Sequence, residues 1–498
     1  MKVDVAAKPL ADVAADALVV GVYADGARPG RALAPLDEAM GGMLRAVLDA
    51  EKFQGKSGAV THIHTGGHRV KAARVIVAGL GPRAQVTPEI VRRAASAALR
   101  RARDLGARAV AIELLGDRLP ARQRAHAVVE GAILGTYTFE RYKKEKSDKT
   151  VETLTVVATR ASDRRAATDG ARTGEIFAAA TWFARDLVNG PANDVHPTHL
   201  AEVAGEVARD GRLGLKILER DECEKLGMGA FLGVAAGSEQ PPKFIHLTYK
   251  PSAARRRVAV IGKGITFDAG GLDLKTAEGM LRMKDDMSGA AAVLGIMRAL
   301  PKLKPQVEVH GLIAATENMP SGTAFRPGDV LRAMNGTTIE IGNTDAEGRL
   351  TLADALAYAA KHVEPDEAID MATLTGACVV ALGPLCSGLF SNDQRLADRL
   401  LAAADAAGER MWQLPLIDEY KEQLRSTVAD LNNVGQRGGG AITAALFLRE
   451  FAGDMKWAHL DIAGAAFTEN ELPLSPRGGT GVAVRTLLAY LTDGTARR

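Results

Sequence analysis

Short hydrophobic strand segments alternate with helical segments along most of the chain, and this alternation constrains the fold more than any other feature. Residues 15–23 (ADALVVGVY) and 74–81 (RVIVAGLG) are continuous apolar runs of the kind found in strands buried on both faces. After them, Thr87 is a suitable N-cap, Pro88 a suitable first helical residue and Gly106 a suitable helix end. Strands that alternate with helices in this way predict an α/β protein with a central, mostly parallel sheet.

The pattern changes character near residue 165, which suggests two domains. A long helical segment runs from about residue 162 to 188 and ends at Asn189-Gly190-Pro191, so we interpret it as a connector. Residues 1–165 hold 28 Lys+Arg and 18 Asp+Glu, a balance of +10, whereas residues 166–498 have a balance of −7. We therefore predict a smaller N-terminal mixed-sheet α/β domain over 1–165 and a larger C-terminal catalytic α/β domain over 166–498.

Composition excludes several classes of protein. Hydrophobic residues make up 47% of the chain and charged residues 25%, which argues against a mainly disordered protein. Three cysteines cannot form a disulfide framework and fit a reducing compartment. No apolar run approaches the length of a membrane span, and acidic residues interrupt the N-terminal segment where a signal peptide would be apolar. We expect a cytoplasmic protein with no membrane partner.

Three familiar motifs give only weak signals. Residues 256–261 predict a strand that ends in a glycine turn at Gly262-x-Gly264, but Phe267 stands where a dinucleotide-binding turn has its third glycine. His62 and His64 would share one face of a strand, yet no third ligand accompanies them, so histidines of a surface hairpin are the preferred interpretation. The chain contains neither a phosphate-binding P-loop nor a G-x-S-x-G nucleophile elbow.

A stronger signal comes from carboxylates near strand ends and glycine turns. Lys263 and Asp268 flank a passage from a strand into a loop, and Asp286 stands before a helix that starts near Ser288, where an N-cap is the simpler interpretation. Asp345 and Glu347 are two residues apart, so in an extended segment they would face the same side. Like charges raise one another's pKa, and two divalent cations remove that cost. The spacing therefore predicts a di-metal hydrolase that uses Zn, Mn or Mg.

At these residues the chain resembles the leucyl aminopeptidase family of cytosolic dinuclear-metal peptidases. The segment NTDAEGRL (343–350) carries the family signature, and GKGITFDAGG (262–271) and KDDMSGAAAV (284–293) resemble its other blocks in order and spacing. The likeness covers nearly all of residues 170–498. Over residues 1–165 only the order of strands and helices is similar, which implies a macro-like N-terminal domain.

The resemblance implies roles for the five ligand positions. Asp268 and Glu347 would bridge two metal ions, Asp345 would complete the ligands of the more tightly held ion, and Lys263 and Asp286 would serve the other. A lysine can bind a metal only as the neutral amine, so the ions must lower its pKa.

The resemblance also implies a mechanism. The free α-amine of a peptide would bind one metal, and a bridging hydroxide would attack the scissile carbonyl. Lys275 would donate to the oxyanion, and Arg349 would hold a bicarbonate ion that passes the proton. The side-chain pocket for leucine and similar apolar residues would be lined by Met283, Thr373, Gly376 and Ala463.

For the whole protein, the resemblance implies a homohexamer, a dimer of trimers, that acts on peptides with a free N-terminus. Two other hypotheses stay open at this point. The basic N-terminal half would permit an additional DNA-binding or regulatory role, which predicts salt-dependent binding of duplex DNA. A different di-metal hydrolase, such as a phosphoesterase, would want more cationic side chains around the metals than Lys275 and Arg349 supply.

Overall fold

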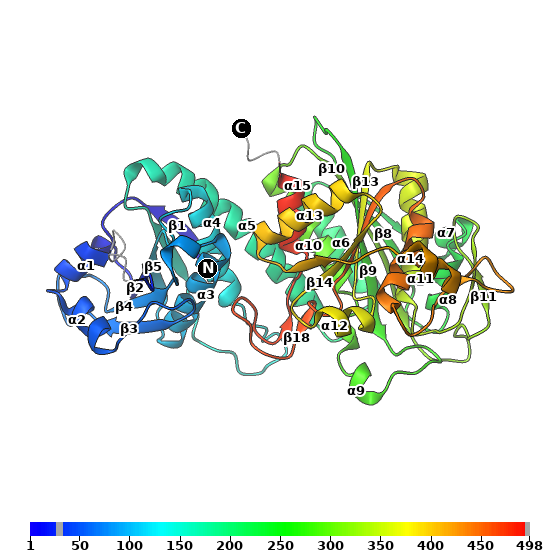
Figure 1. Cartoon of the computed structure of the whole chain (residues 1–498), viewed down its shortest axis with the longest axis horizontal. Helices are drawn as coiled ribbons and strands as arrows, with labels where there is room; N and C mark the ends of the chain where they lie inside the picture. Colours follow the sequence, from blue (N-terminus) through cyan, green and yellow to red (C-terminus); the bar gives the residue numbers. More distant parts are fainter. Residues whose placement is uncertain (26–32, 494–498) are drawn as a thin grey trace. The chain divides into compact units, whose positions relative to one another are not determined.

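The computed structural model describes residues 1–25 and 33–493, and its residue contacts divide into two compact units (Figure 1). The first unit comprises Met1–Trp182 and Asn470–Arg477, and the second comprises Phe183–Glu469 and Gly478–Arg498. Helix α5 (Arg164–Asn189) begins in the first unit and ends in the second. The division by contacts therefore falls inside this helix, whereas the predicted domain boundary at residue 165 lies near its start.

The first unit is built on a six-stranded mixed sheet with the strand order β1-β6-β5-β2-β4-β3. All neighbouring strands are parallel except β3, which pairs antiparallel with β4 at one edge. The histidines of the predicted surface hairpin lie on this edge strand. The strands are β1 (Lys2–Ala6), β2 (Ala17–Val22), β3 (Val60–His64), β4 (Arg74–Gly79), β5 (Ala109–Glu113) and β6 (Thr153–Val157); the helices are α1 (Leu33–Ala39), α2 (Met43–Ala50), α3 (Pro88–Asp104) and α4 (Ala121–Gly135), with short turns of helix at Leu10–Asp12, Arg83–Gln85 and Ala161–Asp163.

The position of β2 between two cores explains why its sequence is apolar without interruption. Ala17 and Val19 pack in the core under α3 and α4, while Leu18 and Val20 pack in a second core under α1 and α2. Successive side chains of a strand point to opposite faces, so a strand covered on both faces needs apolar residues at every position. The predicted start of α3 is confirmed, because the Thr87 side chain accepts a hydrogen bond from Ile90 N at 3.4 Å.

The second unit contains an eight-stranded sheet with the strand order β15-β14-β17-β13-β9-β10-β8-β7. Its centre, β17-β13-β9-β10, is parallel, and antiparallel pairs flank it on both sides. The strands of this sheet are β7 (Gly214–Leu218), β8 (Lys243–Tyr249), β9 (Arg257–Asp268), β10 (Glu308–Asn318), β13 (Glu367–Ala372), β14 (Ser387–Ser391), β15 (Met411–Gln413) and β17 (Lys456–Asp461); the short strands are β11 (Val330–Arg332), β12 (Thr338–Glu340), β16 (Leu431–Asn432), β18 (Phe467–Thr468) and β19 (Gly478–Gly479).

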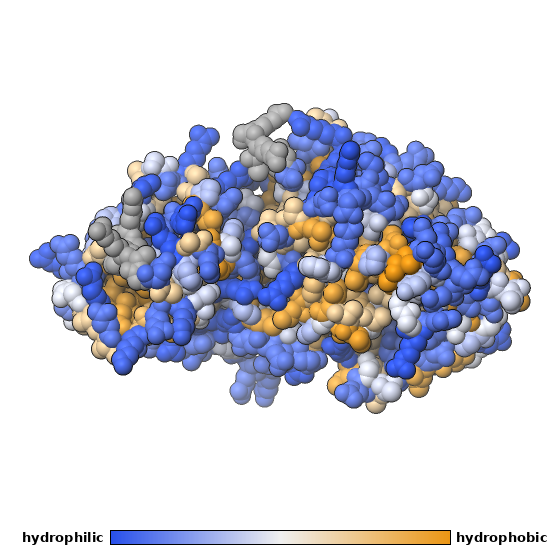
Figure 2. All heavy atoms as spheres, viewed as in Figure 1, coloured by the Kyte–Doolittle hydropathy of each residue, from blue (hydrophilic) through white to orange (hydrophobic). Residues whose placement is uncertain are grey.

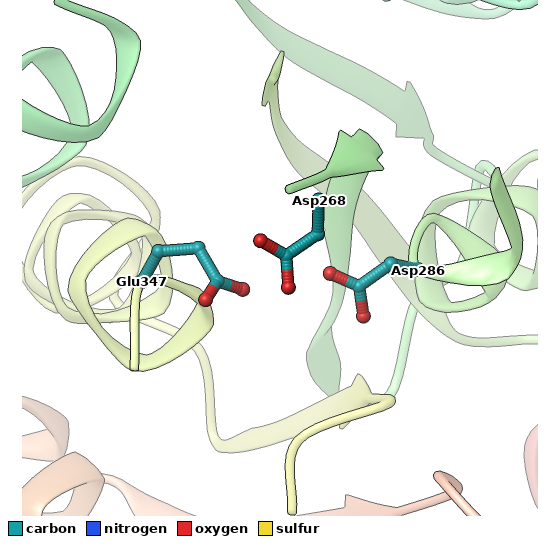
Figure 3. Close-up of side chains that lie close together, drawn as sticks. All are labelled: Asp268, Asp286 and Glu347. Atoms are coloured by element: carbon teal, nitrogen blue, oxygen red, sulfur yellow. The ribbon is translucent and has the colours of Figure 1, made fainter. Parts of the chain in front are cut away.

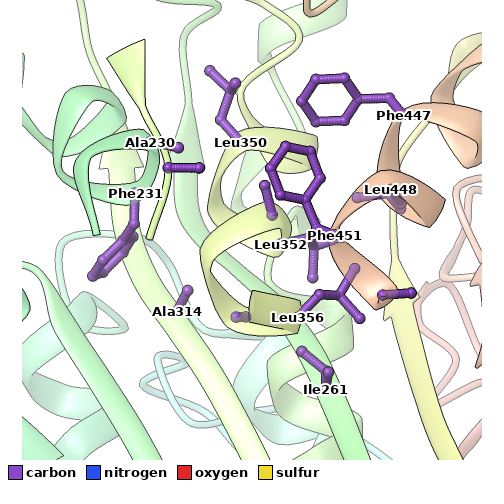
Figure 4. Packing of buried hydrophobic residues seen from close by; sticks show 14 of the residues in the cluster. Ala230, Phe231, Ile261, Ala314, Leu350, Leu352, Leu356, Phe447, Leu448 and Phe451 are labelled. Atoms are coloured by element: carbon purple, nitrogen blue, oxygen red, sulfur yellow. The ribbon is translucent and has the colours of Figure 1, made fainter. Parts of the chain in front are cut away.

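Helices cover both faces of this sheet. Helices α8, α11 and α14 pack over one face, where Phe231, Leu356 and Phe447 belong to a single buried cluster (Figure 4). Helices α6, α10 and α15 lie on the other side, with α10 against β9, β10 and β13. The helices are α6 (Pro197–Gly211), α7 (Arg220–Lys225), α8 (Gly229–Ala235), α9 (Ala277–Met280), α10 (Ser288–Leu303), α11 (Gly348–Tyr358), α12 (Gly376–Leu382), α13 (Gln394–Ala407), α14 (Gly440–Ala452) and α15 (Val484–Thr492), with shorter helical turns at Met283–Asp285, Ala359–Val363 and Asp418–Leu424.

The glycine turn predicted after residue 261 is wrong, because β9 continues without a break to Asp268. Gly262 is needed for packing: a Cβ on it would lie 2.4 Å from the carbonyl oxygen of Gly289, at the start of α10. A Cβ on Gly264 would lie 3.0 Å from the carbonyl oxygen of Ala314 on the neighbouring strand. Both glycines thus allow close backbone approach inside the sheet rather than a turn around a nucleotide.

Two features relate to the environment predicted from the sequence. Cys223 and Cys378 are buried and Cys386 is partly exposed, and all three thiols are free. Within residues 1–25 and 33–493, no helix is both long enough and apolar enough to cross a membrane.

Candidate metal centre

The sheet of the second unit brings the predicted carboxylates to one edge. Asp268 is the last residue of β9, and its neighbours β10 and β13 run in the same direction, so their carboxyl ends meet there. Asp286 stands just before α10 and Glu347 just before α11, the two helices that pack against β9 from opposite sides. Open α/β sheets bind their ligands at this edge because side chains from several strands converge on it.

Asp268, Asp286 and Glu347 form a tight carboxylate cluster (Figure 3). Each is at most 3% exposed, and each contributes an oxygen that lies within 4.8 Å of the oxygens from the other two. In Figure 3 the three side chains point toward a common centre. Lys263 lies beside this centre, with its Nζ 2.8 Å from Asp286 Oδ1 and 2.8 Å from Glu347 Oε1.

A second lysine holds the fourth predicted carboxylate. Lys275 Nζ is 2.8 Å from Asp268 Oδ2 and 2.5 Å from Asp345 Oδ1. Asp345 is thus connected to the carboxylate cluster through Lys275 and lies outside the group of three. The segment that carries Asp345 and Glu347 is a turn rather than an extended strand, so the prediction that both face the same side because of strand geometry is wrong.

The electrostatics of the site are those of charged groups buried in the protein interior. Burial raises the pKa of Asp286 and of Glu347, and repulsion from neighbouring carboxylates, among them Asp268 in both cases, adds to the effect. Burial also disfavours the charge on Lys263, but the carboxylates of Asp286 and Glu347 outweigh it and raise the pKa of the ammonium. The protein by itself therefore holds its acids in place with two ammonium groups.

Several polar atoms of the site remain poorly satisfied. Asp286 Oδ2, Asp345 Oδ1 and Glu347 Oε1 are buried oxygens that have only ion-pair contacts to lysine, without the direction of a hydrogen bond. Buried polar atoms normally find a hydrogen-bond partner, so these oxygens retain capacity to bind a further group. Clustered carboxylate oxygens together with an amine are suitable ligands for divalent cations. The residues present therefore fit a metal centre.

Polar neighbours fix the orientation of the cluster, and sequence reasoning missed most of them. Asn318, the last residue of β10, donates from Nδ2 to Asp268 Oδ1 at 2.9 Å, and Gly270 N donates to the same oxygen at 2.8 Å. Thr373 donates from Oγ1 to Asp286 Oδ1 at 2.7 Å. The signal for Asn318 was available, because an asparagine that ends a buried apolar strand is as unusual as Asp268 itself.

The simpler interpretation of Asp286 as an N-cap is wrong. The N-cap position of α10 is Met287, and no side chain caps this helix. Asp286 instead directs its oxygens to Lys263 and Thr373. An acid that turns away from the free N–H groups of a helix toward a buried lysine serves the site rather than the helix.

The predicted side-chain pocket residues lie around the same edge. The carbonyl oxygen of Thr373 accepts a hydrogen bond from Lys263 Nζ at 3.1 Å, so Thr373 borders the cluster directly. Asp461 joins the segments that carry Thr373 and Ala463, because Leu374 N and Ala463 N both donate to its Oδ1. Gly376 is exposed at the start of α12, and Met283 is half-buried in the turn before Asp286.

Arg349, the arginine predicted to be catalytic, uses one guanidinium nitrogen in a hydrogen bond and leaves another without a partner. Arg349, in the first turn of α11, donates from Nη1 to the carbonyl oxygen of Asn433 at 2.7 Å. Its Nε is buried and has no hydrogen-bond partner among residues 1–25 and 33–493. Burial lowers the pKa of Arg349 to about 10.

This fold and this carboxylate centre define a metal-dependent hydrolase of the α/β type. Residues 182–488 match the cytosol aminopeptidase family, catalytic domain, and residues 19–146 match the cytosol aminopeptidase family, N-terminal domain. The chain therefore belongs to the cytosol aminopeptidase family, and it is a metal-dependent aminopeptidase. This confirms the family resemblance, the fold class and the class of enzyme predicted from the sequence.

Individual relatives agree over nearly the full length. The chain is 46% identical over 492 residues to a probable cytosol aminopeptidase of Gloeobacter violaceus, covering 96% of each chain. It is 43% identical over 494 residues to one of Sulfurihydrogenibium sp., covering 99% of this chain and 98% of that one. Among solved structures, a mutant of tomato leucine aminopeptidase matches with a TM-score of 0.89 and 37% identity, over 99% of this chain and 96% of that one. The bottromycin maturation enzyme BotP in complex with Mn matches with a TM-score of 0.86 and 39% identity, over 96% and 99%.

Proposed function

We propose that this enzyme removes N-terminal leucine and similar apolar residues from peptides, with two divalent metal ions held at the carboxylate cluster. The observation that carries the proposal is the convergence of three buried carboxylates, two of which have oxygens that only form ion pairs with Lys263. When bound, the ions would polarise the scissile carbonyl and lower the pKa of a water molecule.

The five ligands in this proposal are Lys263, Asp268, Asp286, Asp345 and Glu347. The family resemblance makes Asp268 and Glu347 the bridging candidates, and both belong to the carboxylate cluster. Lys263 would bind as the neutral amine, so loading with metal would release its proton. The Mn complex of BotP supports manganese as one ion, and Zn and Mg are the other candidates.

Lys275 is our candidate for stabilising the oxyanion. Its ammonium is held by Asp268 and Asp345 next to the cluster, and these carboxylates raise its pKa against the effect of burial. It would therefore stay charged and donate a hydrogen bond to the oxygen on which negative charge develops.

Arg349 is our candidate for holding a bicarbonate ion that relays the proton. Its unpartnered buried Nε supports this role, because a guanidinium donates readily to a planar oxyanion. No side-chain general base is assigned in this mechanism.

The leucine preference rests on Met283, Thr373, Gly376 and Ala463. Gly376 is exposed and a Cβ added to it would meet no atom within 4 Å, so a substrate side chain has room to lie against it. Varying the residue released, from leucine to alanine, lysine and glutamate, and comparing kcat/KM tests the preference directly.

A homohexamer, organised as a dimer of trimers, is also part of the proposal, as is a cytoplasmic location like that named for the relatives. Exposed apolar side chains support an assembly: Leu281 is 86% exposed and Leu274 60% exposed, in the loop between Asp268 and Asp286, and Val380 on α12 is 89% exposed. Figure 2 shows apolar side chains gathered on the viewed face of the second unit around the position of α12. Soluble monomers rarely expose such patches without a partner. Mass photometry distinguishes a hexamer from smaller states.

The experiment that tests the proposal is release of leucine from leucyl amide. Activity should disappear after chelation and return on addition of Mn or Zn, and Glu347→Ala should remove turnover while leaving the fold intact. Glu450→Ala, on the exposed face of α14, is the matched control and should keep full activity. Turnover that survives both chelation and Glu347→Ala would contradict the proposal. DNA binding through the basic N-terminal half has no supporting observation, and a salt-dependent shift of duplex DNA remains its test.

A further inference from the structure

The first unit contains a cavity of about 150 Å³ that plays no part in the metal centre, because every residue lining it lies between Gly21 and Asp163. Its walls are mainly polar. Six charged side chains line it: Arg83, Glu113, Asp117, Arg124, Arg160 and Asp163.

The cavity lies where an α/β sheet binds ligands. It is lined by Gly21 and Tyr23 at the carboxyl end of β2 and by Glu113 and Gly116 at the carboxyl end of β5. Strands β2 and β5 are parallel neighbours in the middle of the sheet. The chain proceeds from β2 to β4 on one side and from β5 to β6 on the other, so the strand order reverses between them. Ligand sites of open α/β sheets occur at this reversal because the two connections diverge and leave a crevice.

One charged pair in the cavity is already satisfied. Arg83 contacts Asp117 through two hydrogen bonds, from Nε to Oδ1 at 3.1 Å and from Nη2 to Oδ2 at 2.7 Å. Tyr23 adds a hydrogen bond from its hydroxyl to Asp117 Oδ1 at 2.6 Å. The carboxylate of Asp117 is therefore already satisfied by Arg83 and Tyr23.

Glu113 is different, because it is only 8% exposed and just one of its two carboxylate oxygens accepts a hydrogen bond. Its Oε1 accepts from Gly21 N at 2.6 Å, and among residues 1–25 and 33–493 no side chain donates to Oε2. Burial raises the pKa of Glu113 to about 7, and the hydrogen bond from Gly21 N and the charge of Arg124 offset this only in part. A cationic group in the cavity would supply the missing partner.

Arginines supply the opposite charge. Arg124 donates from Nε to the carbonyl oxygen of Leu115 at 3.1 Å and from Nη2 to that of Leu114, which holds its guanidinium in place and leaves Nη1 available. Arg160 is exposed, and its side chain makes no hydrogen bond or ion pair within the described part of the chain. The cavity thus offers a carboxyl oxygen of Glu113 without a hydrogen-bond donor and two guanidinium groups with free N–H donors, and Asp163 is a further carboxylate in its lining.

We propose that this cavity binds a free α-amino acid with a small side chain, its ammonium group against Glu113 and its carboxylate against Arg124 and Arg160. A zwitterion satisfies both sets of groups at once, whereas a simple anion or cation leaves one set unpaired. A cavity of this volume holds a ligand of about six non-hydrogen atoms, the size of alanine. Free amino acids are also what an aminopeptidase releases, so the ligand would be a product of the enzyme itself.

Calorimetric titration of the whole protein with L-alanine tests the proposal, and a dissociation constant of about 1 mM is expected for so small a ligand. The Glu347→Ala variant separates this site from the metal centre: alanine binding in the cavity should persist in it even if the proposed catalytic role of Glu347 is wrong. Glu113→Gln and Arg160→Gln should each weaken the binding about tenfold or more. Glu38→Gln, at an exposed position of α1, is the control and should bind as the unaltered protein does.

Two further ligands test whether both charges of the zwitterion are needed. Acetate carries only the negative charge and ethylamine only the positive one. Both should bind far more weakly than alanine. Because Arg160 is exposed, Arg160→Gln will fold even if the buried Glu113→Gln does not. The proposal is overturned if Glu347→Ala shows no saturable alanine binding, if Arg160→Gln binds alanine unchanged, or if acetate alone binds as tightly as alanine.

Discussion

Replacing Lys263 with methionine should destabilise the metal-free enzyme far more than the metal-loaded enzyme. The Lys263 side chain is 4% exposed, and its ammonium contacts Asp286 and Glu347, whose side chains are 5% and 2% exposed. Methionine has a similar length and no charge, so it fills the space but leaves two buried carboxylates without this cation. Removing one partner of a buried ion pair costs about 3–5 kcal/mol.

This free energy corresponds to a decrease in Tm of roughly 6–10 °C, taking about 2 °C per kcal/mol for a unit of this size. With metal bound, the cations neutralise the same carboxylates, and the loss should fall to about 1 kcal/mol or less, apart from weaker metal binding through the missing ligand. Thermal unfolding followed by fluorescence, in chelator and in excess Mn, measures both values.

The matched control is Lys302→Met, at an exposed position of α10, which should change Tm little in either condition. An equal decrease in Tm with and without metal would refute the reasoning, since it would mean that cations do not replace the ammonium of Lys263. If the metal-free Lys263→Met protein were as stable as the metal-free unaltered protein, the ammonium of Lys263 would not stabilise the carboxylates, and the reasoning would also fail.

Three further predictions follow from single residues. Gly376→Val should lower kcat/KM for leucyl substrates about tenfold and for alanyl substrates less, because the new side chain enters space that a larger substrate side chain would need; a parallel loss for both substrates would contradict a pocket role. Burial and His310 lower the pKa of His246 to about 4, so the folded state keeps this imidazole neutral while the unfolded state binds a proton below pH 6.5. The corresponding stability, about 3 kcal/mol, should be present above pH 6.5 and lost as the pH falls toward 4, and His246→Gln should flatten this part of the stability profile in urea titrations. Asp354→Ala should cost about 2–4 kcal/mol, measured by the same titrations, because buried Asp354 accepts from Phe231 N at 2.8 Å and from Met334 N at 2.7 Å; a loss below 1 kcal/mol would show that other groups or water replace it.

The sequence alone predicted those helices and strands whose formation depends on local chemistry. The continuous apolar run of β2 requires burial on both faces, and Thr87-Pro88 can start a helix without help from the rest of the chain. The long helix and its stop at Asn189-Gly190-Pro191 are local in the same way. For the site, the carboxylates and the lysine could be named from their spacing and from the family signature.

Only the tertiary structure decided which side chains meet. The glycines at 262 and 264 look like a turn in sequence, yet they lie inside β9 because α10 and β10 approach the backbone there. Asp286 has the sequence position of an N-cap, but its oxygens bind Lys263 of β9 and Thr373, which follows β13, instead of the helix. The cavity beside Glu113 has no motif at all, because it arises where two strands far apart in the chain become neighbours. Contacts between distant segments depend on how sheets and helices pack, and no local pattern of residues records that packing.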